Sequence, residues 1–144
     1  MDVKFRPFNH NDSSELREMI FSLYSEDPDG GKVKEENISG TIRELTANSH
    51  KGTITIFETE GEVIGYAILI FFWSNEYGGD ILHIDEIYVK PSWRGKGIAS
   101  DFINGYMDKV KAIWLEVIPT NEKAMRFYKK LGFKETKNTW LIKK

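Results

Sequence analysis

A short basic turn with two glycines stands where a strand-like segment gives way to a helical pattern. The turn is RGKGIAS, residues 94–100, and it follows the run EIYVK. The first amides of a helix have no partner within the helix and carry a partial positive charge, and glycines let a ligand approach the backbone closely. Arg94 and Lys96 add formal charge beside Gly95 and Gly97. The pattern predicts a phosphate-binding turn; the alternative is a solvated loop with two basic residues.

Two other phosphate-binding patterns fit this turn less well. The P-loop pattern, in which Lys and then Ser or Thr close a glycine-rich loop, is absent from the sequence. Residues 95–100 nearly match the dinucleotide fingerprint, and Glu116 follows about 20 residues later, but Ser100 replaces the last glycine. That fingerprint usually lies in the first βα unit of a parallel sheet, whereas antiparallel strands are expected first here. A nicotinamide or flavin domain is therefore a weaker alternative.

The strand that leads into the turn, residues 81–90, has an irregular hydrophobic pattern. Leu82 and Ile84 are apolar at even positions, and then Ile87 and Val89 are apolar at odd positions, so the parity changes between Ile84 and Ile87. A β-bulge at Asp85–Glu86 would produce this slip, and it would unpair a backbone group and re-aim two carboxylates. The alternative is a strand buried on both faces, in which case parity carries no information.

Several alternating or apolar segments predict strands. Residues 3–8 read as a first strand, and two more flank a hairpin turn at Glu60–Gly61. A turn-rich loop, residues 74–80, precedes the irregular strand. Two further strands are expected at AIWLEVI, residues 112–118, and in the tail from Phe133.

Apolar residues at helical spacing predict four helices between these strands. The first is capped by Asp12 or Ser13 and broken near Pro28, and the last is closed by Gly132. The expected apolar stripes are Leu16, Met19, Ile20 and Leu23; Ile38, Ile42 and Leu45; Ile98, Phe102, Tyr106 and Val110 within residues 97–111; and Phe127 and Leu131. The order β-α-α-β-β-β-α-β-α-β predicts a mixed α/β (α+β) fold with a mostly antiparallel central sheet and flanking helices.

The composition narrows the class of protein. The 144 residues suit one domain, residues 1–144, and the net charge of −2 argues against general nucleic-acid binding. No cysteine is present, which excludes disulfides, a thiol nucleophile and thiolate metal sites. The N-terminus lacks the apolar core of a signal peptide, and no apolar run is long enough to cross a bilayer. We expect a soluble, cytoplasmic protein without a metal or a membrane partner, either a monomer or a homodimer.

Two blocks of the sequence resemble one known family. IYVKPSWRGKGIA is similar to the pyrophosphate-binding motif of the Gcn5-related N-acetyltransferases, and Arg94, Gly97 and Ala99 match that motif. LEVIPTNEKAMRFYKKLGF is similar to the next strand and helix of the family. The blocks have the family's order and separation, and the expected order of elements fits its fold, the acyl-CoA N-acyltransferase type.

The resemblance implies acyl-coenzyme A, normally acetyl-CoA, as the donor and a primary amine as the acceptor. It places the pyrophosphate on the amides of Gly95, Lys96, Gly97, Ile98, Ala99 and Ser100, and it pairs the pantetheine arm with the strand edge at Ile87, Tyr88 and Val89, because the next strand splays away. It also assigns Asn121, Ala124 and Tyr128 to the cofactor site, with Ala124 small enough to let the cofactor pass. Asn121 and Tyr128 are two helical turns apart and point the same way.

Direct acetyl transfer requires three kinds of group. The departing thiolate benefits from a proton donor, and the resemblance assigns this role to Tyr128; the plain alternative is a core aromatic residue. The oxyanion needs a donor, which a free N–H near the bulge could supply. The amine must lose a proton, and Glu86, Asp85 and His83 are the candidate bases, since the family uses a carboxylate or a histidine on this strand. Solvated or ion-paired strand residues are the alternative reading.

The acceptor is not determined by the sequence. Glu26, Asp27 and Asp29 precede the second helix, and Glu76 and Asp80 flank the loop at residues 78–79, so an acidic mouth could attract a polycation. The segments FFWSNEYGG and IDEIYV resemble diamine and polyamine acetyltransferases. A small amine or polyamine is favoured, and protein amines and aminoglycosides are alternatives. The alternative function is a catalytically silent acyl-CoA sensor, which would keep the turn but not need Tyr128.

Overall fold

A computed structural model describes residues 1–27 and 29–144; the helix break expected near Pro28 therefore falls partly outside the described residues. The strands are β1 (Lys4–Pro7), β2 (Thr53–Thr59), β3 (Glu62–Ser74), β4 (Gly79–Val89) and β5 (Ala112–Trp114). The helices are α1 (Ser13–Glu26), α2 (Glu35–Ala47), α3 (Ile98–Asn104) and α4 (Glu122–Lys130), with short 3-10 turns at His10–Asp12 and Pro91–Trp93.

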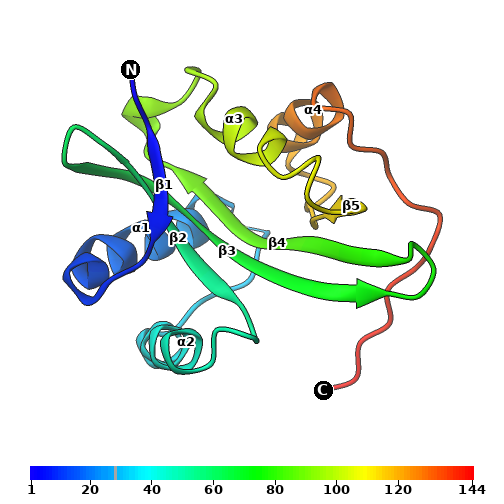
Figure 1. The fold of residues 1–144 in the computed structure, drawn as a ribbon, viewed down its shortest axis with the longest axis horizontal. Coiled ribbons are helices and arrows are strands. Elements are labelled where there is room, and N and C mark those ends of the chain that lie inside the picture. Colours follow the sequence, from blue (N-terminus) through cyan, green and yellow to red (C-terminus); the bar gives the residue numbers. More distant parts are fainter. Residues whose placement is uncertain (28) are drawn as a thin grey trace.

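The five strands form one twisted sheet between two pairs of helices. The strand order is β1-β2-β3-β4-β5, and every pair is antiparallel except β4 and β5, which run parallel. Figure 1 shows α1 and α2 on one side of the sheet and α3 and α4 on the other. Each pair covers its own core cluster, since apolar side chains on both faces of the sheet must be removed from water. The predicted mixed fold is confirmed.

The predicted bulge in β4 is present. Ile68 of β3 lies opposite Glu86 and Leu69 lies opposite Ile84, which leaves Asp85 as the extra residue. As a result, two apolar residues before the bulge and two after it face the same core cluster, beneath α3 and α4, although the first two have even numbers and the last two have odd numbers. These residues are Leu82, Ile84, Ile87 and Val89. Tyr88 faces the opposite cluster, beneath α1 and α2. The change of parity in the sequence therefore corresponds to a change of register between β3 and β4.

The hairpin between β2 and β3 and the apolar stripes of the first two helices are also confirmed. Glu60 and Gly61 both have positive φ, 51° and 78°, as a tight two-residue hairpin turn requires. The helical stripes are buried or partly buried against β2, β3 and β4, with Leu16 and Ile38 almost fully enclosed. This packing fixes α1 across the face of the sheet that carries Glu86.

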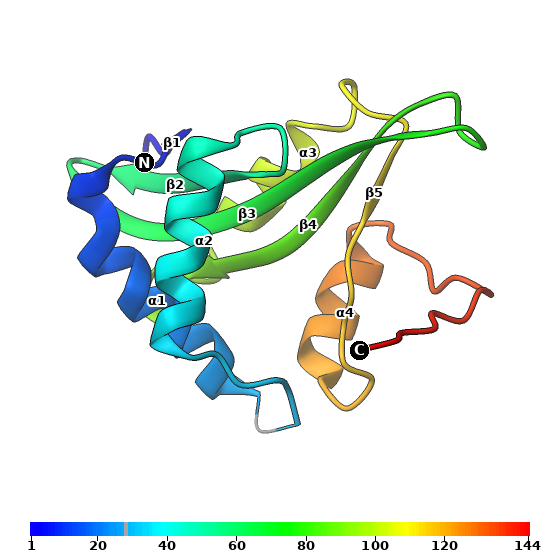
Figure 2. The same cartoon turned by 90° about the horizontal axis from the view of Figure 1, so that it is seen from below.

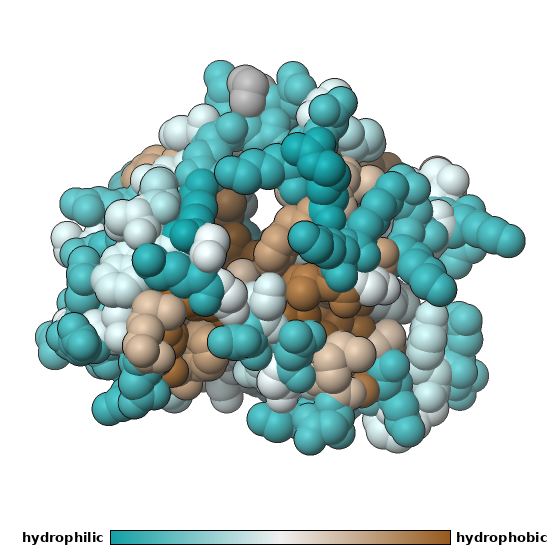
Figure 3. All heavy atoms as spheres, turned by 90° about the horizontal axis from the view of Figure 1, so that it is seen from above, coloured by the Kyte–Doolittle hydropathy of each residue, from teal (hydrophilic) through white to brown (hydrophobic). Residues whose placement is uncertain are grey.

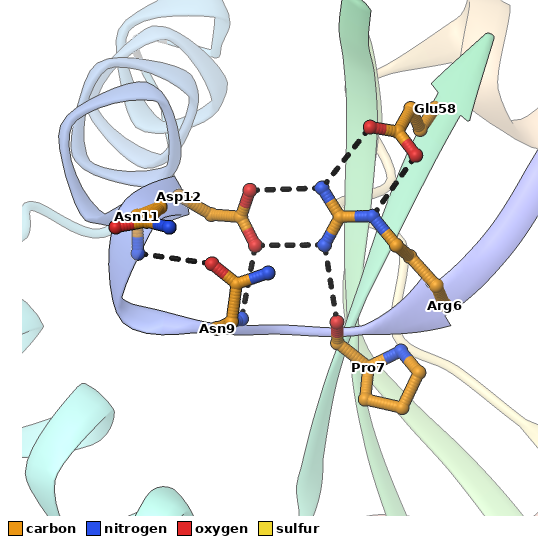
Figure 4. A network of polar contacts seen from close by, with 6 residues as sticks. All are labelled: Arg6, Pro7, Asn9, Asn11, Asp12 and Glu58. Atoms are coloured by element: carbon orange, nitrogen blue, oxygen red, sulfur yellow. Dashed lines mark hydrogen bonds and ion pairs between the residues drawn. The ribbon is translucent and has the colours of Figure 1, made fainter. Parts of the chain in front are cut away.

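An ion-pair network joins the start of α1 to the sheet (Figure 4). Arg6 of β1 donates two hydrogen bonds to Asp12, at 2.8 and 2.9 Å, and another to Glu58 of β2 at 3.1 Å. The guanidinium holds the pKa of Asp12 below its usual range, because hydrogen bonding favours the ionised form. Asp12 precedes α1 as predicted, but its side chain does not cap that helix; it accepts from Arg6 and from the Asn9 amide instead.

Three expectations for the C-terminal third are wrong in extent. Helix α3 ends at Asn104 rather than near Lys111, because i→i−3 hydrogen bonds replace the helical ladder around Gly105, although Tyr106 and Val110 still pack on the core. Strand β5 stops at Trp114 instead of Ile118. Residues 134–144, all of which the structure describes, form no strand, so the last strand of the predicted order is missing. No helix among the described residues has the length and hydrophobicity that crossing a membrane requires.

Candidate active site

The two parallel strands separate soon after they meet. Strands β4 and β5 pair only at three positions, Ile81 to His83, and in the described residues the β5-side edge of β4 from Ile84 onward has no strand partner. Figure 2 shows α1 and α4 on either side of this divergence, and the face in Figure 3 is hollowed near its centre, with apolar walls and a polar rim. An open strand edge therefore lies beside a hollow, and the family resemblance implied such an open edge at the end of β4.

The glycine turn sits directly after this open edge. Gly95 and Gly97 have φ of 76° and 80°, and a Cβ placed on either would meet nothing within 4 Å. Within the described chain, no hydrogen-bond acceptor is found for the amides of residues 95–100; the first amide bonded back to the turn is that of Asp101, to the Gly97 carbonyl at 2.9 Å. The turn thus presents unpaired backbone donors with no side chain in front of its two glycines.

Arg94 is more engaged than the sequence suggested. Its Nε donates to the Val89 carbonyl at 2.7 Å and its Nη2 to Glu26 at 2.6 Å, and the guanidinium stacks 5.2 Å from the Tyr88 ring centroid. Arg94 therefore fastens the glycine turn to the end of β4 and to α1. Lys96 is exposed and supplies the free positive charge of the turn.

Glu86 lies in a hydrogen-bond clamp on the α1 side of the sheet. Tyr24 of α1 donates to its Oε2 at 2.5 Å, and Tyr66 of β3 donates to its Oε1 at 2.7 Å. Burial raises the pKa of Glu86, the two phenol hydrogen bonds oppose that rise, and the neighbouring charge of Asp85 adds to it. A carboxylate with a raised pKa inside a defined set of donors is suited to take up a proton.

The other two candidate bases lie close by in a more open setting. Asp85, the bulge residue, has a side chain that is 50% exposed, and one of its oxygens is 3.9 Å from Nε2 of His83. His83 lies opposite Trp114 in the parallel register. It belongs to the part of β4 that precedes the bulge.

Helix α4 carries the remaining predicted cofactor residues. Asn121 caps the helix, since its Oδ1 accepts from the Ala124 amide at 3.1 Å, so only its amide nitrogen is left to donate. Ala124 is partly buried three residues later. The helix ends at Gly132, with φ of 104°, where the Phe133 amide bonds back to the Tyr128 carbonyl at 3.0 Å.

The orientation of Tyr128 differs from the prediction. Phe127, expected in the core, is 38% exposed, whereas Tyr128 packs against the cluster beneath α3 and α4 with Leu131 and Phe133. Within the described residues its hydroxyl has no hydrogen-bond partner. Burial raises the pKa of Tyr128 to about 12, so the phenol keeps its proton across the neutral range. Tyr128 therefore packs as a core aromatic residue and also keeps a hydroxyl group that can donate a proton.

Part of the predicted acidic mouth is used in contacts that cross the hollow. Glu26 binds Arg94, and Asp29 accepts from the Thr120 hydroxyl at 2.9 Å, which links the α1–α2 loop to the loop before α4. Asp27 accepts from the Asp29 amide. These acids therefore brace the rim of the hollow, and their negative charge is only partly available to a cation.

Sequence reasoning missed the two phenols that hold Glu86, because they lie 62 and 20 residues away from it along the chain. It also missed an aromatic cluster beyond His83, whose rings contact Trp114: Phe72, Tyr77 and Trp140, at centroid distances of 5.3, 6.2 and 6.5 Å. The only local signal was the density of aromatic residues in FFWSNEY and around Trp114. Trp114, which these rings contact, lies opposite His83 in the register of β4 and β5.

The chain is similar to known proteins of one family. The model of the acetyltransferase (GNAT) family matches residues 17–133. The chain is 31% identical over 142 residues to a thialysine N-epsilon-acetyltransferase of Bos taurus, covering 90% of this chain and 83% of that protein. It is 28% identical over 140 residues to a glucosamine 6-phosphate N-acetyltransferase of Trypanosoma brucei brucei, covering 93% and 90%. A crystal structure described as a possible acetyltransferase from Clostridium difficile 630 has the same fold, with a TM-score of 0.84, 20% identity and coverage of 99% and 97%.

Proposed function

Since this chain belongs to the acetyltransferase (GNAT) family, we propose that it moves an acetyl group from acetyl-CoA to a primary amine by direct attack. The observation that carries this proposal is the row of unpaired amides at residues 95–100 beside the open edge of β4. Backbone donors at such a turn suit a pyrophosphate, and an open strand edge suits an extended amide-containing arm. No cysteine is available for an acyl-enzyme.

In this proposal the donor lies along the seam where β4 and β5 separate. The pyrophosphate contacts the amides of Gly95, Lys96, Gly97, Ile98, Ala99 and Ser100. The pantetheine arm pairs with Ile87, Tyr88 and Val89, and it passes Ala124 and the amide nitrogen of Asn121 on α4. Arg94 holds the turn in place through the Val89 carbonyl, rather than acting as a free charge. The thioester then reaches the bulge, where the carboxylates lie.

The chemistry divides between the two sides of this seam. A C–N bond forms and the C–S bond breaks, so one proton leaves the amine and one goes to the departing sulfur. Tyr128 supplies the second proton, which its raised pKa of about 12 keeps available. Glu86, Asp85 and His83 are the groups placed to receive the first. An N–H near the bulge donates to the carbonyl oxygen as negative charge develops.

The acceptor in this proposal is a small-molecule amine, with a polyamine or a protein amine as alternatives. Two relatives similar over most of their length act, by their names, on the ε-amine of thialysine and on glucosamine 6-phosphate, which are both small molecules with a primary amine. The half-exposed Asp85 and the aromatic rings around Trp114 suit a compact cation beside the bulge. A cytoplasmic location, where acetyl-CoA and such amines meet, fits this function.

The test is release of coenzyme A thiol from acetyl-CoA with a panel of amines. The panel contains thialysine, lysine, glucosamine 6-phosphate, spermidine and a peptide with a free N-terminus. Turnover with at least one amine, and acetylation of that amine by mass spectrometry, support the proposal. Tight binding of CoA without turnover on any amine would favour a silent acyl-CoA sensor instead, and binding of NAD(H) without CoA competition would favour a nicotinamide enzyme.

A further inference from the structure

The carboxylate of Glu86 is fixed at both oxygens by phenols from two different elements. Tyr24 reaches it from the C-terminal part of α1, and Tyr66 reaches it from the neighbouring strand β3. A glutamate side chain is flexible, so two charge-assisted hydrogen bonds in opposite directions leave it one orientation. Tyr66 is fully buried, which makes its position part of the core rather than an adjustable contact.

Both phenols act only as donors. Burial raises the pKa of Tyr66 and of Tyr24, and their hydrogen bonds to Glu86 raise both further, so neither gives up its proton near neutral pH. An ionised carboxylate has about four acceptor positions, and the phenols occupy only one on each oxygen. Glu86 therefore keeps acceptor capacity for a third partner.

Few other titratable groups face this carboxylate. On β4 itself Asp85 precedes it, and Tyr88 faces Tyr66 with ring centroids 6.2 Å apart. The charged side chains that join α1 to the segment after β4 are paired with each other, Lys90 with Glu15 and Arg94 with Glu26. The proton affinity of Glu86 is thus set by burial and Asp85 on one side and by the two phenols on the other.

We propose that Tyr24 and Tyr66 are positioning residues that hold Glu86 as the group receiving the proton of the acceptor amine. This inference rests on the proposed function and selects one of its three candidate bases. As the C–N bond forms, the nitrogen becomes acidic; its N–H bond breaks and the proton passes to a Glu86 oxygen, directly or through one water, and then to solvent. Asp85, half exposed and outside the clamp, attracts the ammonium group.

The test compares the pH dependence of kcat/KM in wild type, Tyr66→Phe and Tyr24→Phe. Each substitution removes a hydrogen bond that favours ionised Glu86, so the pKa of Glu86 rises. The acidic break in the profile should move to higher pH by roughly one unit in Tyr66→Phe, whose buried site admits no replacement donor. The shift should be smaller in Tyr24→Phe, because water can reach that partly exposed site.

Tyr106→Phe is the matched control. Tyr106 is also partly buried and aromatic, but its hydroxyl has no hydrogen bond among the described residues and it packs beneath α3, away from Glu86. Its profile should keep the wild-type break. A role of the clamp in folding alone would lower kcat/KM by the same factor at every pH and leave the break in place.

A second measurement follows Glu86 without turnover. Carboxyl 13C NMR, with the resonance assigned through Glu86→Gln, gives the titration of Glu86 in each folded variant. The inference is supported if the pKa of Glu86 measured by NMR and the pH of the acidic break in kcat/KM both rise in the variants. A titration that rises while the break stays fixed overturns it and leaves the proposed function intact; no acetyl transfer by wild type to any amine overturns both.

Discussion

The part of the molecule up to β4 is more tightly packed than the part after it. Strands β2, β3 and β4 are long, pair with one another and contain fully buried residues such as Ile56, Tyr66 and Leu82. After β4, helix α3 buries Ile98, Phe102 and Ile103, but strand β5 has only three half-buried residues and α4 has no buried residue. The first part holds Glu86, and the second holds the glycine turn and Tyr128.

This difference suggests a division of labour. A proton acceptor needs an environment that does not vary, and the tightly packed sheet under α1 provides it. A binding turn needs exposed backbone donors, which a short helix and an open strand edge provide at a cost in packing. Changes in the second part should therefore affect ligand binding and turnover, whereas changes around Glu86 should also affect folding.

Gly97→Asp should give the largest effect on function. The new side chain would have to adopt the left-handed φ of 80° and would place a negative charge in front of the unpaired amides. We expect CoA affinity to fall by about 100-fold or more, from roughly 3 kcal/mol of lost binding, measured by calorimetry.

Gly61→Asp is the control for this change. Gly61 has nearly the same φ, 78°, and also has open space around a Cβ, but it lies in the hairpin between β2 and β3. It should cost similar stability and leave CoA affinity unchanged. Equal loss of affinity in both variants would show that backbone strain, rather than the turn itself, is responsible.

Tyr128→Phe should lower turnover and spare binding. Positioned proton transfer contributes about 100-fold or more, so we expect kcat to fall by about 100-fold with CoA affinity nearly unchanged. Since burial raises the pKa of Tyr128 to about 12, wild-type kcat/KM should show no loss from ionisation of this phenol up to about pH 10. Wild-type turnover in the variant would remove Tyr128 from the mechanism.

Glu86→Leu should lower folding stability as well as turnover. It leaves the buried hydroxyl of Tyr66 without an acceptor, a loss of about 1–3 kcal/mol in the free energy of unfolding. Adding Tyr66→Phe should return part of that loss, because both polar partners are then gone. Chemical denaturation of the two single variants and the double variant measures the coupling; strictly additive losses would mean that the clamp is not a unit.

The local sequence pattern was sufficient to predict a feature where the packing follows that pattern directly. The bulge at Asp85 left a parity slip between Ile84 and Ile87, and the hairpin at Gly61 left a turn residue between two alternating runs. The family motif likewise located the glycine turn. Each of these features is determined by neighbours in sequence, so it could be predicted from the sequence.

Features that depend on distant partners could not be predicted in this way. Nothing near Glu86 indicates that Tyr24 and Tyr66 reach it. The stripe on α4 does not show whether Phe127 or Tyr128 faces the core, since that depends on packing against residues distant in sequence. The tail, residues 134–144, has residues that favour strands but forms none, and local propensity does not determine whether a segment pairs with the sheet.

The smallest effect is expected in that tail. Leu141 and Ile142 are 92% and 82% exposed, so replacing both by serine should change the free energy of unfolding by no more than about 0.5 kcal/mol. Leu82→Ala, at a fully buried position in β4, is the contrast and should cost about 2–5 kcal/mol. A tail variant that unfolds as readily as Leu82→Ala would mean that residues 134–144 do pair in solution, and the loosely packed second part would then need a further strand.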